Sequence, residues 1–184
     1  MKFTRRLPLK SLDLLNLRQS AKDGGCRHCH ADGCVKAHGY LYGYGEEGHA
    51  LVTRGLRFFC SNRGSNMGCG RTFSTLWSHL TAHSSMSARQ LLELVAAWSG
   101  CGAVHKAWTS TAVPVSLSTV ARWIRRWKDS ASHIRSHLFQ IQAPPGDAAM
   151  STSQFTLRYL KAAFARETCP AAAFQERFQH SFLL

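Results

Sequence analysis

Four cysteines arranged in two pairs constrain the fold of this chain more than any other feature. Two residues separate Cys26 from Cys29, and eight separate Cys60 from Cys69. Two cysteines on one tight turn present both thiolates on the same side, and a second pair brought alongside completes the tetrahedral four-sulfur site that Zn²⁺ prefers. The stretch between the pairs has room for a β-hairpin. The pattern therefore predicts a zinc ribbon with one structural Zn²⁺, because so small a ribbon has too thin an apolar core to fold without metal.

Other metal-ligating side chains lie close to the first pair. Cys34 or His30 could replace Cys60 or Cys69, because a standard ribbon has only two residues between the members of its second pair. The eight residues found here are small, polar and turn-forming, so they can loop out and return Cys69 to the metal. This favours the four paired cysteines. A closed four-thiolate site indicates a structural metal and not a catalytic one.

The chain is strongly basic. Its 184 residues include 23 lysines and arginines against 10 aspartates and glutamates, which gives a formal net charge of +13. Such a protein is expected to bind a polyanion, most often DNA or RNA and less often a membrane surface, since solubility alone does not require so unequal a balance. Hydrophobic residues make up 45% of the chain, which excludes a disordered tail. Nucleic acid is therefore the first partner to consider.

The cysteines and the N-terminus indicate a cytoplasmic protein. The chain has seven cysteines, an odd number, and several cluster with histidines, which favours metal binding over a secreted disulfide framework. The N-terminus begins like a signal peptide, but Lys10, Asp13 and Arg18 interrupt its apolar stretch. No run approaches the roughly 18 apolar residues that a membrane span requires, so no membrane association is expected.

Short alternating and aromatic segments predict the hairpin of the ribbon. Residues 39–44 are expected to form one strand, residues 46–48 a turn and residues 49–54 the returning strand, and residues 56–59 alternate up to the second cysteine pair. The aromatic side chains of the first strand could stack on bases, but in a small ribbon they more often form the core. We therefore expect a buried position for Tyr40, Tyr42 and Tyr44.

Apolar residues at helical spacing predict five helices after the ribbon. They cover residues 87–98, 103–108, 116–127 with an extension to about residue 140, 151–167, and 171–182. The first helix is expected to end before Gly100, and Ser116 is the expected cap of the third. Cys101 and Cys169 are expected to be small buried residues of this helical part. Apolar anchors for oligomerisation or a partner are predicted on the last two helices at Phe155, Tyr159, Phe164, Phe174 and Phe178.

The helix 116–127 has an apolar side and a basic side. The residues expected to face the core are Leu117, Val120, Ile124 and Trp127, with Trp123 at the edge. A helix, a break and a Ser-capped helix with arginines on one side are typical of a helix-turn-helix. Side chains near the start of such a helix reach base edges, and later ones meet phosphates. We therefore assign base readout to Ser118, Thr119 and Arg122, and backbone contacts to Arg125, Arg126, Lys128 and, on the ribbon, Arg71. The alternative is a solvated basic face on an ordinary bundle helix.

Changes in composition divide the chain into four parts. Residues 1–25 form an N-terminal arm, residues 26–75 the zinc ribbon, residues 76–142 the helix-turn-helix domain, and residues 143–184 a linker and C-terminal helices. The predicted fold is mainly α with a small β zinc ribbon, followed by the helix-turn-helix and the C-terminal helices.

The order of these motifs resembles a known arrangement. Arg57-Phe-Phe-Cys60 followed by Cys69-Gly-Arg-Thr-Phe-Ser74 and a helix-turn-helix looks like the N-terminal region of bacterial insertion-sequence transposases and their small accessory proteins. The resemblance covers roughly residues 26–128, and the eight-residue gap departs from the commonest pattern. In that family this region binds the terminal inverted repeats of the element. The resemblance implies that the four paired cysteines hold zinc and that residues 116–127 form the recognition helix.

A complete transposase of this kind adds an RNase H-like domain whose carboxylates bind two metal ions. The acidic residues after the helix-turn-helix are few, and their surroundings indicate helix and linker: Asp129, Asp147, Glu167 and Glu176. We therefore expect no enzyme activity, and predict a sequence-specific DNA-binding protein of a mobile element in the bacterial cytoplasm, at the nucleoid. It could act with a transposase and as a homodimer. Alternatives are a DNA-binding fragment of a transposase, a nuclease using His79 and His83, or an RNA- or protein-binding zinc module.

Overall fold

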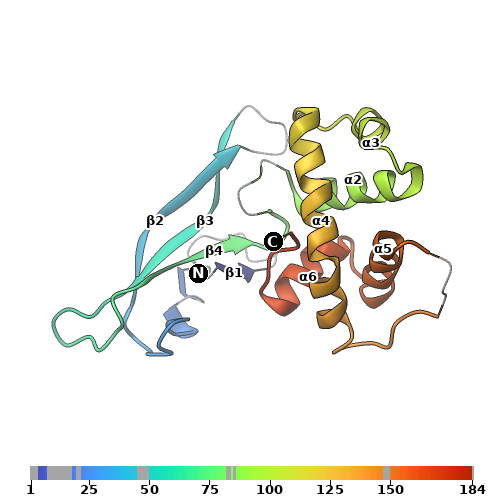
Figure 1. Cartoon of the computed structure of the whole chain (residues 1–184). Coiled ribbons are helices and arrows are strands. Elements are labelled where there is room, and N and C mark those ends of the chain that lie inside the picture. The colour runs from blue at the N-terminus through green and yellow to red at the C-terminus, as the bar shows by residue number, and fades with distance from the viewer. Residues whose placement is uncertain are drawn as a thin grey trace.

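A β-sheet lies on one side of the molecule and the helices on the other (Figure 1). The computed structural model describes residues 4–7, 18–19, 22–44, 50–81, 84, 86–146 and 150–183. The elements in chain order are β1 (Thr4–Leu7), β2 (Val35–Tyr44), β3 (Leu51–Cys60), β4 (Thr72–Trp77), α2 (Ala88–Cys101), α3 (Val104–Thr111), α4 (Leu117–Leu138), α5 (Thr152–Ala163) and α6 (Pro170–Phe178). The chain is therefore a mixed α and β protein, and none of the described helices is long and apolar enough to cross a membrane.

The strands of the sheet follow the order β1-β4-β3-β2. The predicted hairpin is present as the antiparallel pair β2 and β3, while the predicted turn at 46–48 lies outside the described residues. β3 joins two segments that were expected to be separate, and β4 pairs antiparallel with it. β1, from the predicted arm, pairs in parallel with β4, with Thr4 opposite Ser74. Local patterns do not predict β1 because a pairing this distant in sequence leaves no local signal.

The tyrosines of β2 are exposed, and the prediction that they form the ribbon core was wrong. Tyr40, Tyr42 and Tyr44 are 41%, 65% and 55% exposed. The reason is that β2 is an edge strand, while helix α6 contacts the opposite edge of the sheet, at β1. The core of the sheet is formed instead by β3 and β4, where the rings of Phe58 and Phe73 stack with 5.5 Å between centroids.

The helix boundaries follow from caps. α2 begins after Ser87, whose hydroxyl accepts the N–H of Gln90 while the Gln90 side chain accepts the N–H of Ser87. α2 passes through Gly100, where it was expected to stop, and ends at Gly102, whose φ of 70° is the left-handed conformation of a helix C-cap. Ser116 caps α4 as predicted, since its hydroxyl accepts the N–H of Thr119.

The helices share one apolar core. α4 buries Val120, Trp123, Ile124, Trp127 and further residues toward Leu138 against the neighbouring helices. Two details differ from the expectation: Leu117 is 37% exposed, and Trp123 lies inside the core. Cys101 is exposed and Cys169 half-buried, so the prediction that both are buried was wrong for Cys101, which follows the last buried turn of α2.

The aromatic residues of the C-terminal helices pack inside the chain. Tyr159, Phe164 and Phe174 are buried in the helical core, and Phe155 and Phe178 pack against it. The segment after α6 also returns to α4, where the rings of Phe182 and Trp127 lie 5.2 Å apart between centroids. These side chains therefore stabilise the helical core of a single chain, and they are not exposed anchors for a partner.

Glutamine side chains of α6 connect the sheet to the helices. The buried amide of Gln175 donates to the carbonyls of Ser78 and Leu80 just after β4 and accepts the N–H of Phe182. Gln179 bonds both backbone groups of Arg6 in β1. The Arg6 guanidinium is buried and donates to the Leu80 carbonyl at 2.6 Å, and this burial, with Arg54 nearby, lowers the pKa of Arg6 to about 10. The two sides of the molecule are thus held together by polar contacts.

Replacing Gln175 with Ala is expected to lower the free energy of unfolding by about 1–3 kcal/mol, because it leaves buried backbone groups without partners. Urea unfolding followed by circular dichroism measures the change. The control is Gln140→Ala, an exposed glutamine at which we expect a change of at most about 0.5 kcal/mol. Equal losses for the two variants would contradict the role of the α6 contacts.

Candidate metal centre

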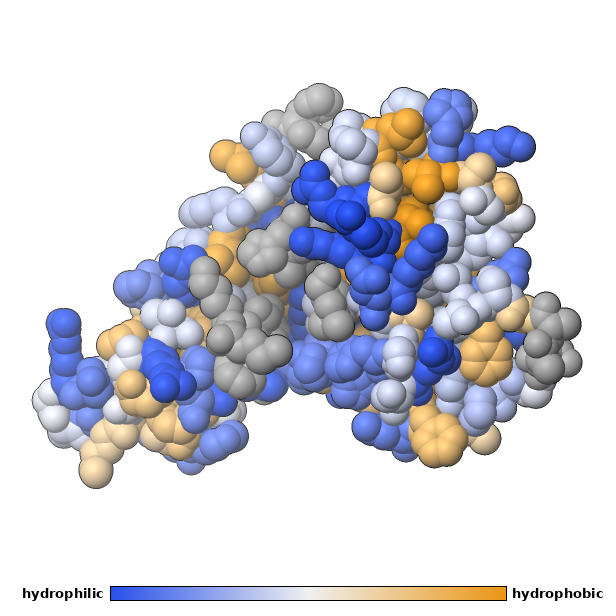
Figure 2. Space-filling view, in the orientation of Figure 1, coloured by the Kyte–Doolittle hydropathy of each residue, from blue (hydrophilic) through white to orange (hydrophobic). Residues whose placement is uncertain are grey.

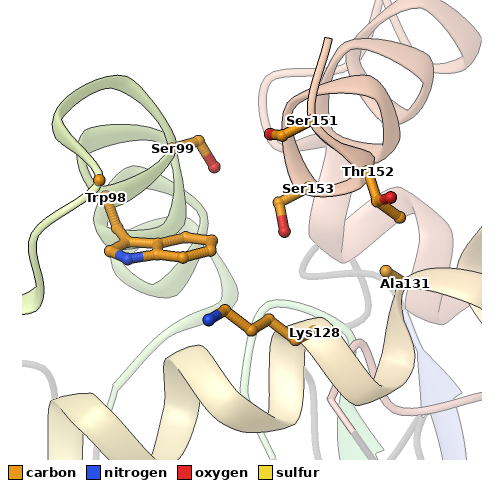
Figure 3. Close-up of a pocket in the computed structure, with 8 residues that line it drawn as sticks. Trp98, Ser99, Lys128, Ala131, Ser151, Thr152 and Ser153 are labelled. Atoms are coloured by element: carbon orange, nitrogen blue, oxygen red, sulfur yellow. The ribbon is translucent and has the colours of Figure 1, made fainter.

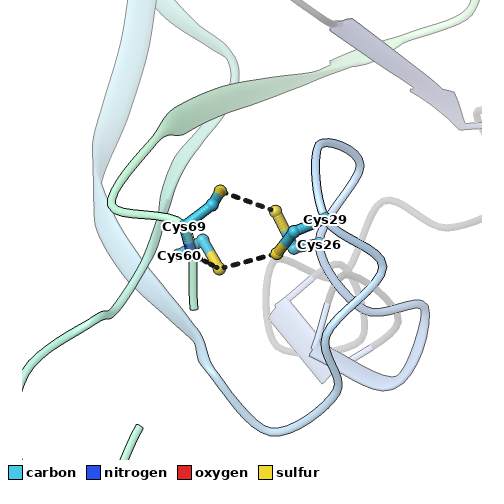
Figure 4. Close-up of side chains that lie close together, drawn as sticks. All are labelled: Cys26, Cys29, Cys60 and Cys69. Atoms are coloured by element: carbon cyan, nitrogen blue, oxygen red, sulfur yellow. Dashed lines mark hydrogen bonds between the residues drawn. The ribbon is translucent and has the colours of Figure 1, made fainter. Parts of the chain in front are cut away.

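Four sulfur atoms meet beside the sheet. The side chains of Cys26, Cys29, Cys60 and Cys69 place their ligand atoms within 4.8 Å of one another. The Sγ atoms of Cys26 and Cys69 are 3.7 Å apart, as are those of Cys29 and Cys60 (Figure 4). A metal with metal–sulfur bonds of about 2.3 Å in tetrahedral geometry has sulfur–sulfur separations of about 3.8 Å. The cluster therefore has the dimensions of a site for one structural metal ion.

The first pair is held by a tight turn. The His30 N–H donates to the Cys26 carbonyl at 2.8 Å, and the Cys26 N–H donates to Ala31. The His28 N–H points at the Cys26 sulfur, at 3.3 Å. Backbone N–H groups directed at sulfur stabilise the thiolate form that a metal requires. The turn thus positions two thiols on the same side, next to the second pair.

The second pair forms a similar turn in spite of the insertion. Cys60 ends β3, and its carbonyl accepts the N–H of Gly70 at 2.9 Å, while the Cys69 N–H lies 3.3 Å from the Cys60 sulfur. The residues between loop out, and the Gly68 N–H donates to the Ser61 carbonyl to close that loop. The eight-residue gap is therefore compatible with the cluster, as the sequence predicts.

Two glycines are required for this close packing. A Cβ on Gly68 would lie 2.2 Å from the Ser61 carbonyl oxygen and 2.5 Å from the Cys60 sulfur, so no larger residue fits without a backbone shift. Gly70 has a φ of 69°, in the left-handed region that glycine adopts without steric cost. Both glycines therefore allow the chain to turn back toward the metal position.

The alternative ligands do not join the cluster. Cys34 is buried in the core of the sheet, and its backbone carbonyl accepts the N–H of Ser61. His30 is exposed, with a φ of 59° that belongs to the turn. The candidate group consists of the four paired cysteines alone among these residues.

The thiols of the cluster differ in acidity. A hydrogen bond from the Ala31 backbone lowers the pKa of the exposed Cys29 to about 7. Burial raises the pKa of Cys60 to about 12 and also raises that of Cys69. A bound cation supplies the positive charge that would keep all four sulfurs ionised, so metal binding and proton release are coupled.

We expect Cys29 to react first with iodoacetamide in metal-free protein, and its rate should rise as the pH increases through about 7. The reason is that the thiolate is the nucleophile and is favoured above its pKa. Cys60 should react far more slowly. Mass spectrometry of the alkylated peptides measures the order, and added Zn²⁺ should protect Cys29 while leaving the exposed Cys101 reactive. Equal reactivity of Cys29 with and without Zn²⁺ would argue against a metal at this site.

The residues predicted to contact DNA lie mainly on the solvent side of α4. Ser118, Arg122, Arg125 and Arg126 are exposed, opposite the buried face of the helix. Hydrophilic side chains gather over the middle of α4 in the space-filling view (Figure 2). Within the described residues, no ion pair or side-chain hydrogen bond engages these three arginines. Their charges are therefore available to a ligand.

Three further predicted contacts occupy different settings. Thr119 is half-buried, and its hydroxyl lies 3.0 Å from that of the capping Ser116. Arg71 is exposed at the start of β4, beside the cysteine cluster. Lys128 is also exposed, but its ammonium lies over the Trp98 ring at 5.0 Å from the centroid. Lys128 is thus turned toward α2 and away from the arginine side.

Trp98 and Lys128, which contact each other, line a pocket between α2, α4 and the start of α5 (Figure 3). Its other lining residues are small or carry hydroxyl groups: Ser99, Gly102, Ala131, Ser151, Thr152 and Ser153. No carboxylate, histidine or cysteine lines this pocket, so its described walls provide no acid–base pair or nucleophile–base pair.

A second cluster of metal-ligating side chains was not predicted as a site. It consists of His133 and His137 on α4 and His180 just beyond α6. The spacing of four residues between the first two was a signal in the sequence, because residues at i and i+4 share a helix face. His180 gave no such signal, since only the tertiary fold brings it to α4. Of the histidines considered for a nuclease, His83 lies outside the described residues.

Comparison with protein-family models, with curated proteins and with solved structures found no match to this chain.

Proposed function

We propose that this protein binds double-stranded DNA sequence-specifically, that the cysteine cluster holds one structural Zn²⁺, and that the protein acts with a mobile genetic element. The observation that carries the proposal is the exposed arginine face of α4, formed by Arg122, Arg125 and Arg126. It belongs to a chain with a net charge of +13. Cationic side chains without internal partners are what a phosphate backbone requires.

Zinc is the metal that the donor set favours. Four cysteine sulfurs at tetrahedral separations suit Zn²⁺, which has no geometric preference of its own and binds thiolates at about 2.3 Å. When bound, the ion would offset part of the negative charge of the four thiolates and would join the turn after Cys26 to the end of β3. This site supports the fold and leaves no position for a substrate.

In this proposal α3 and α4 form a helix-turn-helix, with α4 as the recognition helix. The turn between them, residues 112–116, includes Ala112 with a φ of 47° and leads into the Ser116 cap. The first turns of α4 carry Ser118 and Arg122, which can reach base edges, and Thr119 contributes its methyl or hydroxyl group. Arg125 and Arg126 lie further along and contact phosphates.

Two contacts outside this face complete the assignment. Arg71 adds a phosphate contact from the sheet side of the molecule. Lys128 reaches phosphate only if it leaves the Trp98 ring, so its contribution is smaller than that of the arginines. A second copy of the chain or a transposase is the protein partner in this proposal. The protein itself carries out no catalysis, and it acts in the bacterial cytoplasm.

The exposed tyrosines of β2 favour a second candidate function, binding of RNA or single-stranded nucleic acid. The rings of Tyr40 and Tyr42 lie 6.0 Å apart, and the Arg18 guanidinium lies 5.5 Å from the Tyr40 ring centroid. Exposed aromatic rings next to arginine are the groups on which unpaired bases stack. Competition of unlabelled RNA against a duplex DNA probe separates the two functions.

Purified protein is expected to contain one equivalent of zinc on the cysteine cluster and to bind random duplex DNA with an affinity that falls steeply with salt. Each neutralised phosphate contributes about −0.9 to the slope of log affinity against log salt, so Arg71, Arg125 and Arg126 together predict a slope of about −3. Elemental analysis and fluorescence anisotropy measure the two quantities. Zinc without DNA affinity would sink the proposal and leave a protein partner as the ligand.

Replacing Arg122 with Ala is expected to reduce the preference for the specific site by about 1–3 kcal/mol, because a base contact is lost. Arg125→Ala should instead weaken binding to specific and random DNA about equally. The control is Arg89→Ala on α2, where the exposed arginine pairs with Glu93 at 3.0 Å. It removes the same charge from a different helix. Binding is measured with a duplex selected from a random pool, and identical effects of Arg122→Ala and Arg125→Ala would refute the assignment of base readout.

A further inference from the structure

Three histidines from two parts of the chain meet at the C-terminal half of α4. The ligand atoms of His133, His137 and His180 lie within 4.8 Å of one another. The Nε2 atoms of His133 and His137 are 3.2 Å apart, and the ring centroids of His180 lie 5.1 Å and 5.0 Å from theirs. Histidines are uncommon partners for one another unless they share a proton or a metal, so the cluster requires a physical explanation.

The geometry of the first pair suits one metal ion. Histidines four residues apart on a helix present their rings on the same face, which is the spacing used by helical zinc sites. Tetrahedral zinc with zinc–nitrogen bonds of about 2.0–2.1 Å has nitrogen–nitrogen separations of about 3.3 Å. The observed 3.2 Å matches this value.

The third histidine is positioned by the polar contacts of α6. Gln179 ends that helix with a φ of 55°, and its side chain is fixed to both backbone groups of Arg6. This left-handed turn reverses the chain, so that the next residue, His180, returns to α4. The approach of His180 is therefore determined by the fold and does not depend on a flexible side chain alone.

The surroundings keep the rings in place and available as ligands. The His137 ring packs against Phe174 and Phe178, with centroids 5.9 Å and 4.8 Å away. Burial and the neighbouring histidines lower the pKa of His137, and partial burial together with His133 lowers that of His180. Arg135 lies between the α4 histidines in sequence, but its guanidinium donates to Thr156 on α5 and so points away from the cluster.

We propose that His133, His137 and His180 form a second metal site, distinct from the cysteine cluster, that binds one divalent transition-metal ion such as Zn²⁺. Three imidazole ligands leave a fourth coordination position, and the exposed position of His180 opens that side of the site to solvent. A site of this type exchanges its ion more readily than a closed four-thiolate site. Bound metal links the segment after α6 to α4 and stabilises the packing of the C-terminus. Metal binding at these histidines does not depend on DNA binding.

The test uses the full chain with metal retained on the cysteine cluster, titrated with Zn²⁺ in competition with a chromophoric chelator. The wild-type protein is expected to bind one further equivalent of Zn²⁺. His180→Ala and His133→Ala should each weaken this binding at least tenfold, and His105→Ala, an exposed histidine on α3 outside the cluster, should leave it unchanged. His180 lies outside the helices, so its replacement leaves the core intact, and far-ultraviolet circular dichroism verifies the fold of each variant.

The cysteine cluster provides an internal reference. Co²⁺ bound to thiolates gives a charge-transfer band in the near ultraviolet, whereas Co²⁺ on the three histidines does not. Co²⁺ added to protein whose cysteine cluster retains Zn²⁺ should therefore give visible absorption without the charge-transfer band. The His180→Ala replacement should abolish this visible absorption. Histidine ring signals in NMR spectra should shift in proportion to added Zn²⁺ for these three residues alone. The proposal is overturned if wild type takes up no further equivalent, or if His180→Ala binds it as tightly as wild type.

Discussion

Four sulfur atoms within 4.8 Å of one another are the constraint on which the sheet depends. The buried side chains around them are few, and the cluster of buried residues on this side includes Cys26 and Cys60 themselves. Ionised sulfurs this close repel one another, and burial, followed by the neighbouring cysteines, raises the pKa of Cys60. A bound cation would offset both the repulsion between the sulfurs and the cost of burying their charge. Metal binding at the cluster would then add to the small core of the sheet, because it ties the turn at Cys26 to the end of β3.

The contacts of α6 make the sheet and the helices one unit. Gln175 donates to carbonyls that follow β4, and Gln179 bonds β1, the short strand at one edge of the sheet. The side chain–backbone bonds of Gln175 are buried, so their loss leaves polar groups without water or partner, and those of Gln179 are partly buried. These bonds hold β1 and the segment after β4 against α6, and so hold the sheet against the helices.

The sequence predicted those structural features that depend on residues close together in the chain. The spacing of Cys26 and Cys29 and the cap at Ser116 each depend on neighbours within a few residues, and both predictions are confirmed. The apolar period of α4 is confirmed at Val120, Ile124 and Trp127 but not at Leu117. Pairings across long distances were missed. β1 pairs with β4 although the local pattern of the N-terminal segment gives no strand signal.

The errors at single residues have the same cause. The tyrosines of β2 were expected in a core because aromatic residues favour burial, but whether an edge strand is covered depends on elements far away in sequence. Gly100 was expected to end α2, yet tertiary packing outweighs the helix propensity of a single glycine, and the left-handed turn falls at Gly102. The candidate cysteine site could therefore be predicted, whereas the place of His180 could not.

Helix α4 connects these features, because its two halves have different surroundings. The first half exposes Arg122 and its neighbours, while the second half carries the histidines and is covered by α5 and the C-terminal segment. The buried residues Trp127 and Ile134 belong to the same helical core. One core therefore holds α4 over both halves. An ion at the histidines would add a tie between α4 and the segment following α6. Gln179, at the end of α6, also bonds β1. A metal ion at the histidines would therefore strengthen the packing of the helices, which carry the arginine face, against the sheet.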